Sequence, residues 1–539
     1  MRRRFVLPSI LLARQPSLAS NKLLTYRLIR CPDPAAERTW ADIDEMLNQH
    51  FEALDMCVKH VNDITQFSKV NIETNIKNMS LKHALIPNAE EPGIFPNRLL
   101  PFAQNMKFYG RREEIEKMTK HLKVKTTDSY RTYMIYGRRG VGKTELALQF
   151  AYTNPAEYDA IFWIQCETSV SIRQSFTNVA VSLNLPSAYK DGHHEENLIA
   201  VHSWLKRTKK KWLLIFDNAE SPQILREYWP MGAAGAILLT SRKYFNFTKD
   251  MKRRGDTVKP FPLQESWELL LDFLGEDWKQ AEKEGRIIAS ETAAAKSMLS
   301  DLEGLPLAIR QAAVLIKNPE IGGPTIAKTY SMFKERIDSL PERHSTPRST
   351  SERALDALWD MTFNSLSSNA RSLLGVLAWF SPDKIPIELF LPRDQTVLDG
   401  LLSFAKQAAM HINHNQQASL ISVATAAPEF EKVINELLRT SLVRQDGLFY
   451  SIHRVVQEAT TYYDIQDLQD SFRTAAGLVN EQFPKRKMND TLYEKWNRCQ
   501  EYIPHGVHLS KKFQEYSKSL KGTPAFIELL SNCGWLEIL

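Results

Sequence analysis

The sequence predicts a multidomain α/β protein, in which a parallel sheet with helices on both faces is followed by a helical domain and a winged-helix domain. From Arg131 onward, short β-branched or aromatic runs alternate with helical segments, as they do in βαβ units. From about Leu263 to Ile337 the pattern is only helical, and between Phe430 and Tyr462 a helix, a hairpin and a second helix follow one another. The predicted strands of the parallel sheet are Thr132–Tyr136, Ala160–Gln165, Trp212–Phe216 and Ala236–Thr240.

The composition favours a soluble intracellular protein with several domains. With 539 residues, 43% of them hydrophobic, the chain can form three or four packed cores. The five cysteines are far apart and form no CxxC pair or Cys/His cluster with zinc-ligand spacing, which favours a reduced intracellular protein without structural metal. The net charge of +6 is small and acids and bases are interspersed, so we expect no nucleic-acid partner. No run is long and apolar enough to span a bilayer, so we expect a soluble protein without membrane contact.

The first 32 residues are unusual, because they contain seven Arg or Lys and no acid before Asp33. This composition resembles a mitochondrial transit peptide, and a disordered tail or a misplaced start codon also explains it. Further on, Thr39–Phe67 predicts one or two amphipathic helices, and a Pro-containing linker follows at Ala89–Pro101. We expect a cytoplasmic protein with a partly disordered N-terminal region, and mitochondrial targeting is the alternative.

The segment GRRGVGKT at Gly137–Thr144 matches GxxxxGK[ST] at every required position, between a predicted strand and a predicted helix. The glycines let the backbone turn its N–H groups toward phosphate oxygens, and the N-terminus of the helix adds positive potential. Lys143 is expected to reach the β- and γ-phosphates of a nucleotide, and Thr144 to offer its hydroxyl to Mg²⁺. The residues expected to hold the phosphates are Gly137, Gly140, Val141, Gly142, Lys143 and Thr144.

Two polar residues follow later strands of the predicted sheet. The strand Trp212–Phe216 runs into Asp217, and ligands of open α/β sheets bind at this carboxyl edge. Asp217 can therefore hold the magnesium ion opposite Thr144, usually through water. Arg242 follows the strand Ala236–Thr240 and can contact a γ-phosphate, so that it reports whether this group is present.

The C-terminal half predicts a linker, and then a hairpin between helices. Residues Glu342–Glu352 are polar and contain a proline, so we place a linker there. Strands at Ser441–Arg444 and Leu448–Ile452 flank the turn Asp446-Gly447, which is a strong hairpin signal. Because an amphipathic helix precedes the hairpin and another follows it, we predict a winged-helix domain. Beyond Tyr462 the chain is predicted to be helical to its end.

Taken in order, the motifs resemble the NB-ARC domains of STAND-class P-loop NTPases, which occur in plant resistance proteins, apoptotic activators and fungal NOD-like proteins. Besides the phosphate-binding loop, the resemblance rests on FYGRREE at Phe108–Glu114, FWIQ at Phe162–Gln165, LLIFDNAE at Leu213–Glu220, LLTSR at Leu238–Arg242, GLPLAI at Gly304–Ile309 and YSIHRVVQ at Tyr450–Gln457. It extends from Met106 to Leu539. The segments Trp496–His505 and Glu528–Trp535 look like the lead-in to the tetratricopeptide array of fungal members, so we expect a chain truncated before its repeats.

The resemblance implies an adenine nucleotide, ATP or ADP with Mg²⁺, as the ligand. In the family the backbone at Phe108 and Tyr109 borders the adenine, and the bend at Pro306 packs against the base. The resemblance also implies that His453 contacts the β-phosphate of ADP and locks the resting state. The expected domains are an N-terminal region at 1–100, the NB-ARC domain at 101–260, a helical domain at 261–345, a winged helix at 350–462, a helical linker domain at 463–525 and the start of a tetratricopeptide-like array at 526–539.

Several residues depart from the family pattern. Asn218 stands where many relatives have a second acid that polarises the attacking water. Asp217 and Glu220 are therefore the candidates for catalysis, with Glu220 an imperfect substitute, and we expect at most a slow ATPase. The pair Arg138-Arg139 replaces small residues of the loop, and Arg454 replaces an aspartate. We expect these arginines to alter nucleotide affinity or to leave the switch less firmly closed.

The expected function is a conformational switch, in which ADP holds the chain closed and exchange for ATP opens it for self-association, in fungal innate-immunity or incompatibility-type signalling. Three alternatives stay open at this point: a winged-helix transcription regulator, a committed ATPase motor and an inactive truncated fragment. The helix that would read DNA carries Glu429, Glu431 and Glu436 against Lys432 and Arg439. Its net negative charge is a poor match for phosphates.

Overall fold

The computed structural model describes residues 93–124, 131–185, 194–230, 235–245, 254–318, 325–340, 350–406, 428–463, 468–485 and 496–538. The basic N-terminal segment and the helices predicted at Thr39–Phe67 lie outside this described part. All elements below belong to one compact unit, Pro92–Leu539.

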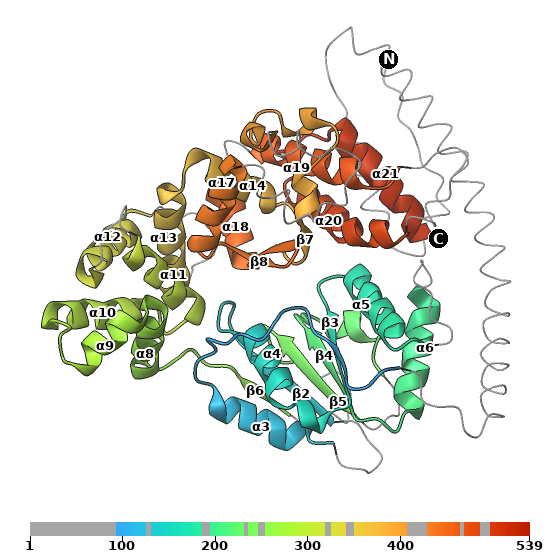
Figure 1. The fold of residues 1–539 in the computed structure, drawn as a ribbon, viewed down its shortest axis with the longest axis horizontal. Helices are drawn as coiled ribbons and strands as arrows, with labels where there is room; N and C mark the ends of the chain where they lie inside the picture. The colour runs from blue at the N-terminus through green and yellow to red at the C-terminus, as the bar shows by residue number, and fades with distance from the viewer. Residues whose placement is uncertain are drawn as a thin grey trace, which may run out of the picture. The chain divides into compact units, whose positions relative to one another are not determined.

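A six-stranded, all-parallel sheet forms the centre of the first part of this unit (Figure 1), with strand order β1-β3-β4-β5-β2-β6. Its strands are β1 (Asn97–Leu99), β2 (Arg131–Tyr136), β3 (Ala160–Gln165), β4 (Trp212–Asp217), β5 (Ala236–Ser241) and β6 (Gly255–Thr257). The four predicted strands are confirmed to within one residue at each end. The short edge strands β1 and β6 were not predicted, and β1 lies inside the segment that we expected to be a linker.

Alternate residues of the central strands point to opposite faces of the sheet, as the period of two requires. Ile135 and Ile161 belong to one buried cluster, whereas Met134 and Phe162 belong to another. Helices α3 (Arg112–Leu122) and α4 (Lys143–Thr153) pack on the first face, and α5 (Ser169–Ser182), α6 (His194–Arg207) and α7 (Pro222–Leu225) pack on the second. The predicted arrangement of helices on both faces is confirmed.

After the sheet the described chain is helical up to residue 377, as predicted for Leu263 to Ile337. The helices are α8 (Leu263–Leu274), α9 (Glu276–Lys283), α10 (Ala289–Asp301), α11 (Pro306–Lys317), α12 (Ile326–Ser339), α13 (Thr350–Ser365) and α14 (Ser368–Leu377). Because α13 begins at Thr350, the last residues of the predicted Glu342–Glu352 linker are helical. A buried hydrogen bond of 2.7 Å from Gln311 Nε2 to Thr362 Oγ1 joins α11 to α13.

A three-stranded sheet of order β7-β9-β8 follows, with helices α17 (Pro428–Arg439) before the hairpin and α18 (Arg454–Tyr463) after it. Strands β8 (Val443–Asp446) and β9 (Phe449–Ile452) form the hairpin, and β7 (Ile385–Pro386) pairs with β9. The predicted order of helix, hairpin and helix is confirmed, although β8 begins two residues later than predicted and β7 was missed. The winged-helix name stays our interpretation of this arrangement.

The C-terminal helices are α19 (Leu468–Gln482), α20 (Trp496–Glu515) and α21 (Pro524–Ile538). They confirm the predicted helical character beyond Tyr462, and the tetratricopeptide assignment stays a prediction. Among the described residues, no helix is both long enough and apolar enough to cross a bilayer.

Candidate functional site

A cavity of about 1270 Å³ lies where the phosphate-binding loop, the start of α11 and the β8–β9 hairpin meet. The predicted site residues that line it are Phe108, Tyr109, Gly140, Val141, Gly142, Lys143, Thr144, Asp217, Arg242, Pro306 and His453. Gly137 and Glu220 are not among the lining residues, although each contacts one of them. The structure therefore brings into one cavity residues that are more than three hundred positions apart in the sequence.

Glycines determine the backbone path of the loop. Gly137, Gly140 and Gly142 have φ values of 153°, 74° and 92°, and a Cβ atom at Gly137 would lie 2.7 Å from the carbonyl oxygen of Val258. Gly142 caps α4 without a side chain, so the first N–H groups of this helix are available to an anion. Lys143 Nζ donates to the carbonyl oxygens of Gly137 at 2.8 Å and Arg138 at 2.9 Å. These bonds hold the ammonium group against the loop.

Three oxygen-bearing side chains meet behind the loop. Thr144 Oγ1 lies 3.1 Å from Asp217 Oδ1, and Thr240 Oγ1 donates to the same carboxylate oxygen at 2.6 Å. Mg²⁺ prefers oxygen ligands and usually takes only one or two carboxylates, with water and phosphates completing its shell. The side chains of Thr144 and Asp217 therefore fit the ion that a nucleotide brings. Thr240 bonds to one oxygen of the Asp217 carboxylate, Oδ1, and not to the other, Oδ2.

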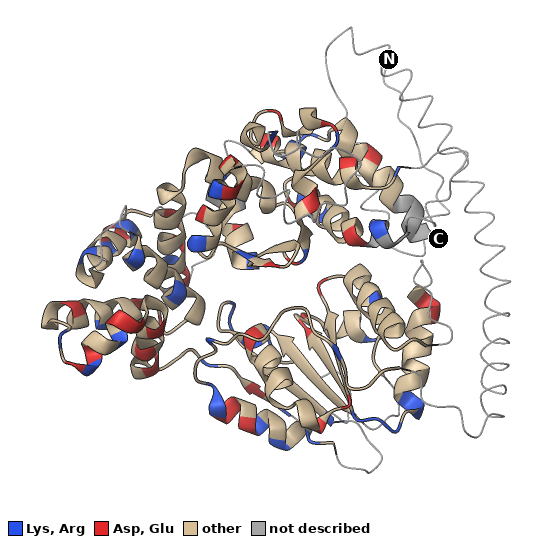
Figure 2. Cartoon of the chain, in the orientation of Figure 1, with Lys and Arg blue, Asp and Glu red and all other residues tan. Residues whose placement is uncertain are grey.

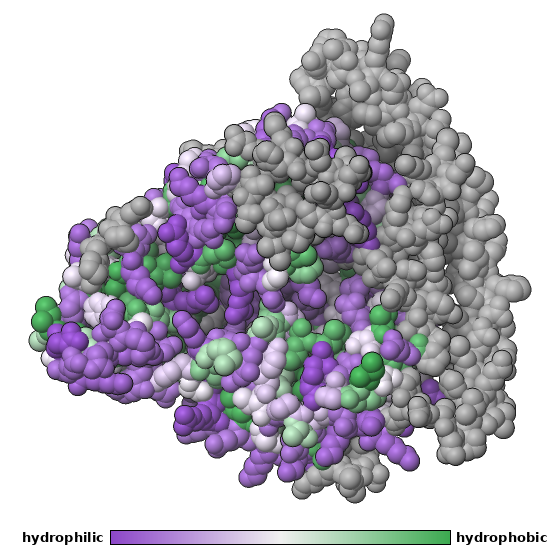
Figure 3. Space-filling view, in the orientation of Figure 1, coloured by the Kyte–Doolittle hydropathy of each residue, from purple (hydrophilic) through white to green (hydrophobic). Residues whose placement is uncertain are grey.

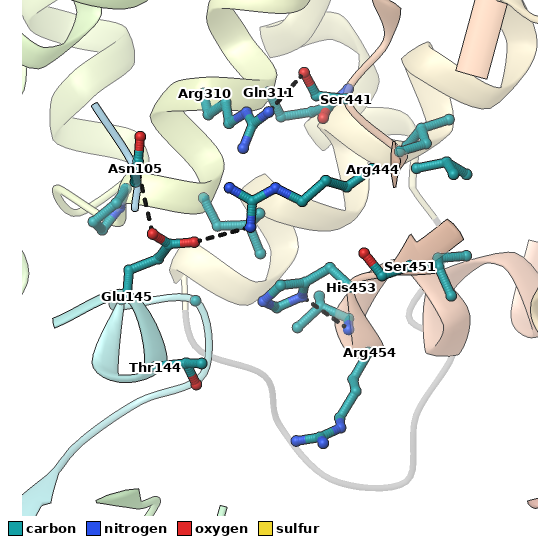
Figure 4. A pocket seen from close by; sticks show the side chains of 18 of the residues that line it. Asn105, Thr144, Glu145, Arg310, Gln311, Ser441, Arg444, Ser451, His453 and Arg454 are labelled. Carbon is teal, nitrogen blue, oxygen red and sulfur yellow. Dashed lines mark hydrogen bonds and ion pairs between the residues drawn. The ribbon is translucent and has the colours of Figure 1, made fainter. Parts of the chain in front are cut away.

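His453 follows the hairpin and borders the cavity. Its Nδ1 accepts a hydrogen bond of 3.2 Å from the backbone N–H of Val455, so in the neutral ring Nε2 carries the proton and can donate to an anion (Figure 4). The ring is open to the cavity, but the protein surrounds that cavity, and this desolvation lowers the pKa of His453 to about 4. Nearby cations, Arg454 and Arg310 foremost, lower the pKa further. The ligand-free protein therefore keeps this ring neutral at pH 7.

The cavity carries an excess of positive charge, because its lining includes eleven Lys or Arg and only four Asp or Glu. Arg444 of β8 reaches across the cavity to Glu145 of α4, with Nη1 3.3 Å from Oε1 (Figure 4). Arg310 of α11 donates to Ser441 Oγ at 3.3 Å, and burial together with Arg444 lowers its pKa. Neither arginine belongs to a motif that we identified in the sequence. Their charge suits a ligand with several negative charges.

Aromatic side chains also line the cavity. The Arg111 guanidinium lies 4.1 Å from the centre of the Phe261 ring, and Tyr109 packs edge-on against the same ring. The backbone N–H of Leu307 donates to the carbonyl oxygen of Gly140 at 3.4 Å, so the start of α11 contacts the loop directly. Pro306 and Phe108 line the cavity. Together these side chains can accept the flat face of a base.

The arginines that depart from the family pattern form ion pairs between separate parts of the chain. Arg138 pairs with Glu303 at 2.5 Å, and Arg139 pairs with Glu458 of α18. Arg454 is half-buried and pairs with Glu167, which follows β3. We expected these residues to alter affinity or to loosen the closed arrangement. That expectation stays a prediction, and in the structure each pair joins the sheet or its loop to a later part of the chain.

We predict that His453 couples ADP binding to proton uptake. A β-phosphate beside the ring favours the imidazolium, so the pKa rises on binding from about 4 and the bound protein holds more protons in the window above that value. The affinity for ADP should therefore rise as the pH falls from 7 to 5, by at most about tenfold per pH unit. Titrations at pH 7, 6 and 5 measure this, and His453→Gln should show only the dependence that comes from ADP itself. Identical pH dependence of the two proteins would contradict the prediction.

Comparison with known proteins identifies families that match two parts of the chain. The NB-ARC domain family matches residues 111–278, and a domain of unknown function (DUF7779) matches residues 361–463, which include the hairpin. A nucleotide-binding leucine-rich repeat (NLR)-like protein of the fungus Hyaloscypha variabilis is 24% identical over 481 residues, which are 83% of this chain and 43% of that protein. The chain thus spans less than half the length of this curated relative.

Solved structures with a similar arrangement include a STAND protein with a tetratricopeptide repeat sensor from Pyrococcus horikoshii, at 13% identity and a TM-score of 0.42, over 84% of this chain and 54% of that one. Another is Cdc6p of Pyrobaculum aerophilum, at 13% identity and a TM-score of 0.33, over 68% of this chain and 97% of that one. The chain has the α/β fold of a P-loop NTPase. Its residues 111–278 are an NB-ARC domain, which implies nucleotide binding.

Proposed function

We propose that the chain is an ADP/ATP-dependent signalling switch, with an ADP-bound resting state and an ATP-bound state that self-associates. The observation that carries this proposal is the cavity itself, because the loop at Gly140, helix α11 at Pro306 and the hairpin end at His453 all line it. A nucleotide held there contacts three parts of the chain at once. It can therefore stabilise one arrangement of these parts over another.

The nucleotide is proposed to bind with its phosphates on the loop. Lys143 and the N-terminus of α4 then face the β- and γ-phosphates, and Thr144 with Asp217 holds Mg²⁺. The base lies toward Phe108, Tyr109 and Pro306, and His453 donates to the β-phosphate. These roles rest on the donors described above and on the excess of positive charge in the cavity.

Hydrolysis is proposed to be slow. Asn218 offers no carboxylate for proton abstraction, and Glu220 is engaged by Arg242, with Nε 3.0 Å from Oε1. A general base must lie within hydrogen-bonding reach of the water that it activates, and the neutral amide of Asn218, directly after Asp217, cannot act as one. Exchange of ADP for ATP, rather than turnover, is then the event that changes the state.

The surface favours a protein partner over a nucleic acid. In the view of Figure 2, Lys and Arg are interspersed with Asp and Glu over the described residues, whereas phosphate backbones favour a patch of positive charge. On the face in Figure 3, hydrophilic residues predominate and hydrophobic ones form smaller groups between them. We propose a cytoplasmic role in signalling of the innate-immunity or incompatibility type, and the name of the fungal relative supports the NLR-like part of this proposal.

Light scattering tests the switch. With ADP and Mg²⁺ the protein should remain monomeric, and with a non-hydrolysable ATP analogue it should form larger particles, because the γ-phosphate favours the open arrangement. Lys328→Ala, an exposed change on α12, should behave as the wild type does. Monomers of identical size with both nucleotides would refute the proposal that the nucleotide controls self-association.

A further inference from the structure

We propose that Arg454, Asn218 and Glu220 form a relay that restrains Arg242, so that the closed hairpin disfavours binding of a γ-phosphate. This inference rests on the proposed function, because it assigns a regulatory role at the same nucleotide site. It joins two departures from the family pattern, Asn218 and Arg454, into one physical unit.

Arg454 begins the relay at the first residue of α18. Its guanidinium pairs with Glu167, and Nη2 lies 3.8 Å from Asp383 Oδ2. Gln165 Nε2 lies 3.5 Å from the same carboxylate oxygen. The charge of Arg454 is therefore compensated by carboxylates on both sides of the contact between the sheet and the hairpin. Such a pair is costly to break from one side, because it would leave a partly buried charge without a partner.

Asn218 is the second member, directly after the proposed magnesium ligand Asp217. Its φ of 59° is a left-handed conformation that asparagine tolerates, and its backbone N–H donates to Thr240 Oγ1 at 2.8 Å. One orientation of the amide satisfies both of its neighbours. In it, Arg454 Nη1 donates to the amide oxygen at 2.8 Å, and the amide nitrogen donates to Glu220 Oε1 at 2.9 Å. The Asn218 amide thus links Arg454 to Glu220 through two hydrogen bonds, so that the position of Arg454 affects the position of Glu220.

Glu220 and Arg242 complete the relay. The carboxylate oxygen that accepts from Asn218 also pairs with Arg242 Nε at 3.0 Å. Arg242 lines the cavity, and it is the cation that we expect to contact a γ-phosphate. A γ-phosphate therefore competes with Glu220 for the same guanidinium, and the two anionic groups repel each other.

This competition explains how the hairpin can influence the choice of nucleotide. While Arg454 holds the amide of Asn218 in place, Glu220 stays on Arg242 and ADP is favoured. When the hairpin moves away, Arg454 leaves Asn218, Glu220 is less restrained and Arg242 is released for the γ-phosphate. By thermodynamic linkage, a bound γ-phosphate must then favour release of Arg454 to the same extent.

The test is the ratio of the affinities for a non-hydrolysable ATP analogue and for ADP, both with Mg²⁺, in which effects common to the two nucleotides cancel. Arg454→Gln should shift this ratio toward the ATP analogue by about three- to tenfold. Glu220→Gln should shift it in the same direction, and its exposed side chain makes a folding defect a lesser concern. Arg473→Gln, which removes an exposed ion pair on α19, is the matched control and should leave the ratio unchanged.

An Arg242→Gln background shows whether the effect passes through Arg242. There, adding Arg454→Gln should no longer change the ratio, because the relay has lost its end point. A shift that persists in this background, no shift in either single variant, or a shift toward ADP would each overturn the relay. If the wild type takes up neither nucleotide, the proposed function fails and the relay fails with it. If the wild type binds both and the variants match it, only the relay fails.

Discussion

Lys143→Ala is expected to yield a folded protein that retains almost no adenine nucleotide through purification. The ammonium group is held against the phosphate-binding loop by the carbonyl oxygens of Gly137 and Arg138. Truncating one partner of a desolvated charge pair typically costs about 2–5 kcal/mol, so we expect the ADP affinity to fall about thirtyfold or more. Chromatographic identification of the nucleotide released from denatured protein, followed by titration of the stripped protein, measures both effects.

The control for this experiment is Lys328→Ala, which removes an exposed lysine of α12 far from the loop in sequence. It should retain the nucleotide as the wild type does. Equal nucleotide content in the wild type and Lys143→Ala would contradict the assignment of the phosphate site to this loop. If all three proteins, the wild type included, took up no adenine nucleotide at millimolar concentration with Mg²⁺, the proposed function would be wrong.

Gly304→Ala is expected to destabilise the protein strongly, although the change adds a single methyl group. Gly304 has a φ of 67°, and a Cβ atom on it would lie 2.0 Å from the carbonyl oxygen of Phe261. The Phe261 backbone N–H also donates to the Gly304 carbonyl oxygen at 2.9 Å, so the two segments cannot separate without losing this bond. Left-handed strain and the clash together should cost about 3 kcal/mol, measured as a lower urea midpoint of the nucleotide-free protein.

Gly285→Ala separates the two contributions. Gly285 has a similar φ of 62°, but nothing lies within 4 Å of the Cβ position. It should therefore cost only the left-handed strain, about 1 kcal/mol. Equal midpoints for the two variants would show that the chain at Phe261 moves aside freely. Because Phe261 packs on Arg111 and Tyr109, Gly304→Ala should also weaken nucleotide binding, and Gly285→Ala should not.

The sequence predicted those parts of the fold whose determinants are local. The loop at Gly137–Thr144 is recognisable because three glycines adopt positive φ values there, and the central strands are recognisable because both of their faces are buried. The edge strand β1, in contrast, could not be predicted from local sequence. Its three residues carry no periodic pattern, and it is held by distant groups: Arg98 donates to the carbonyl oxygens of Tyr158 at 2.7 Å and Asp159 at 3.0 Å.

The site was predictable only in part, for the same reason. Resemblance to a family could place His453 and Arg242 near a nucleotide, since each belongs to a recognisable motif. It could not indicate that Arg444 reaches Glu145, or that Arg454 pairs with Glu167, because these partners belong to no shared motif and meet only in the folded chain. The roles proposed for Arg454 and Asn218 thus rest on interatomic distances in the folded chain and not on sequence motifs.

The buried cluster on one face of the sheet has a consequence for how the chain unfolds. It includes Ile135 and Ile161 and continues through Phe261 into α8 and α11, whereas the cluster on the other face is confined to the sheet and its own helices. Separating the sheet from the following helices near residue 260 would expose apolar side chains on both parts. We therefore expect the nucleotide-binding and helical parts, although their motifs are distinct, to unfold as one cooperative unit.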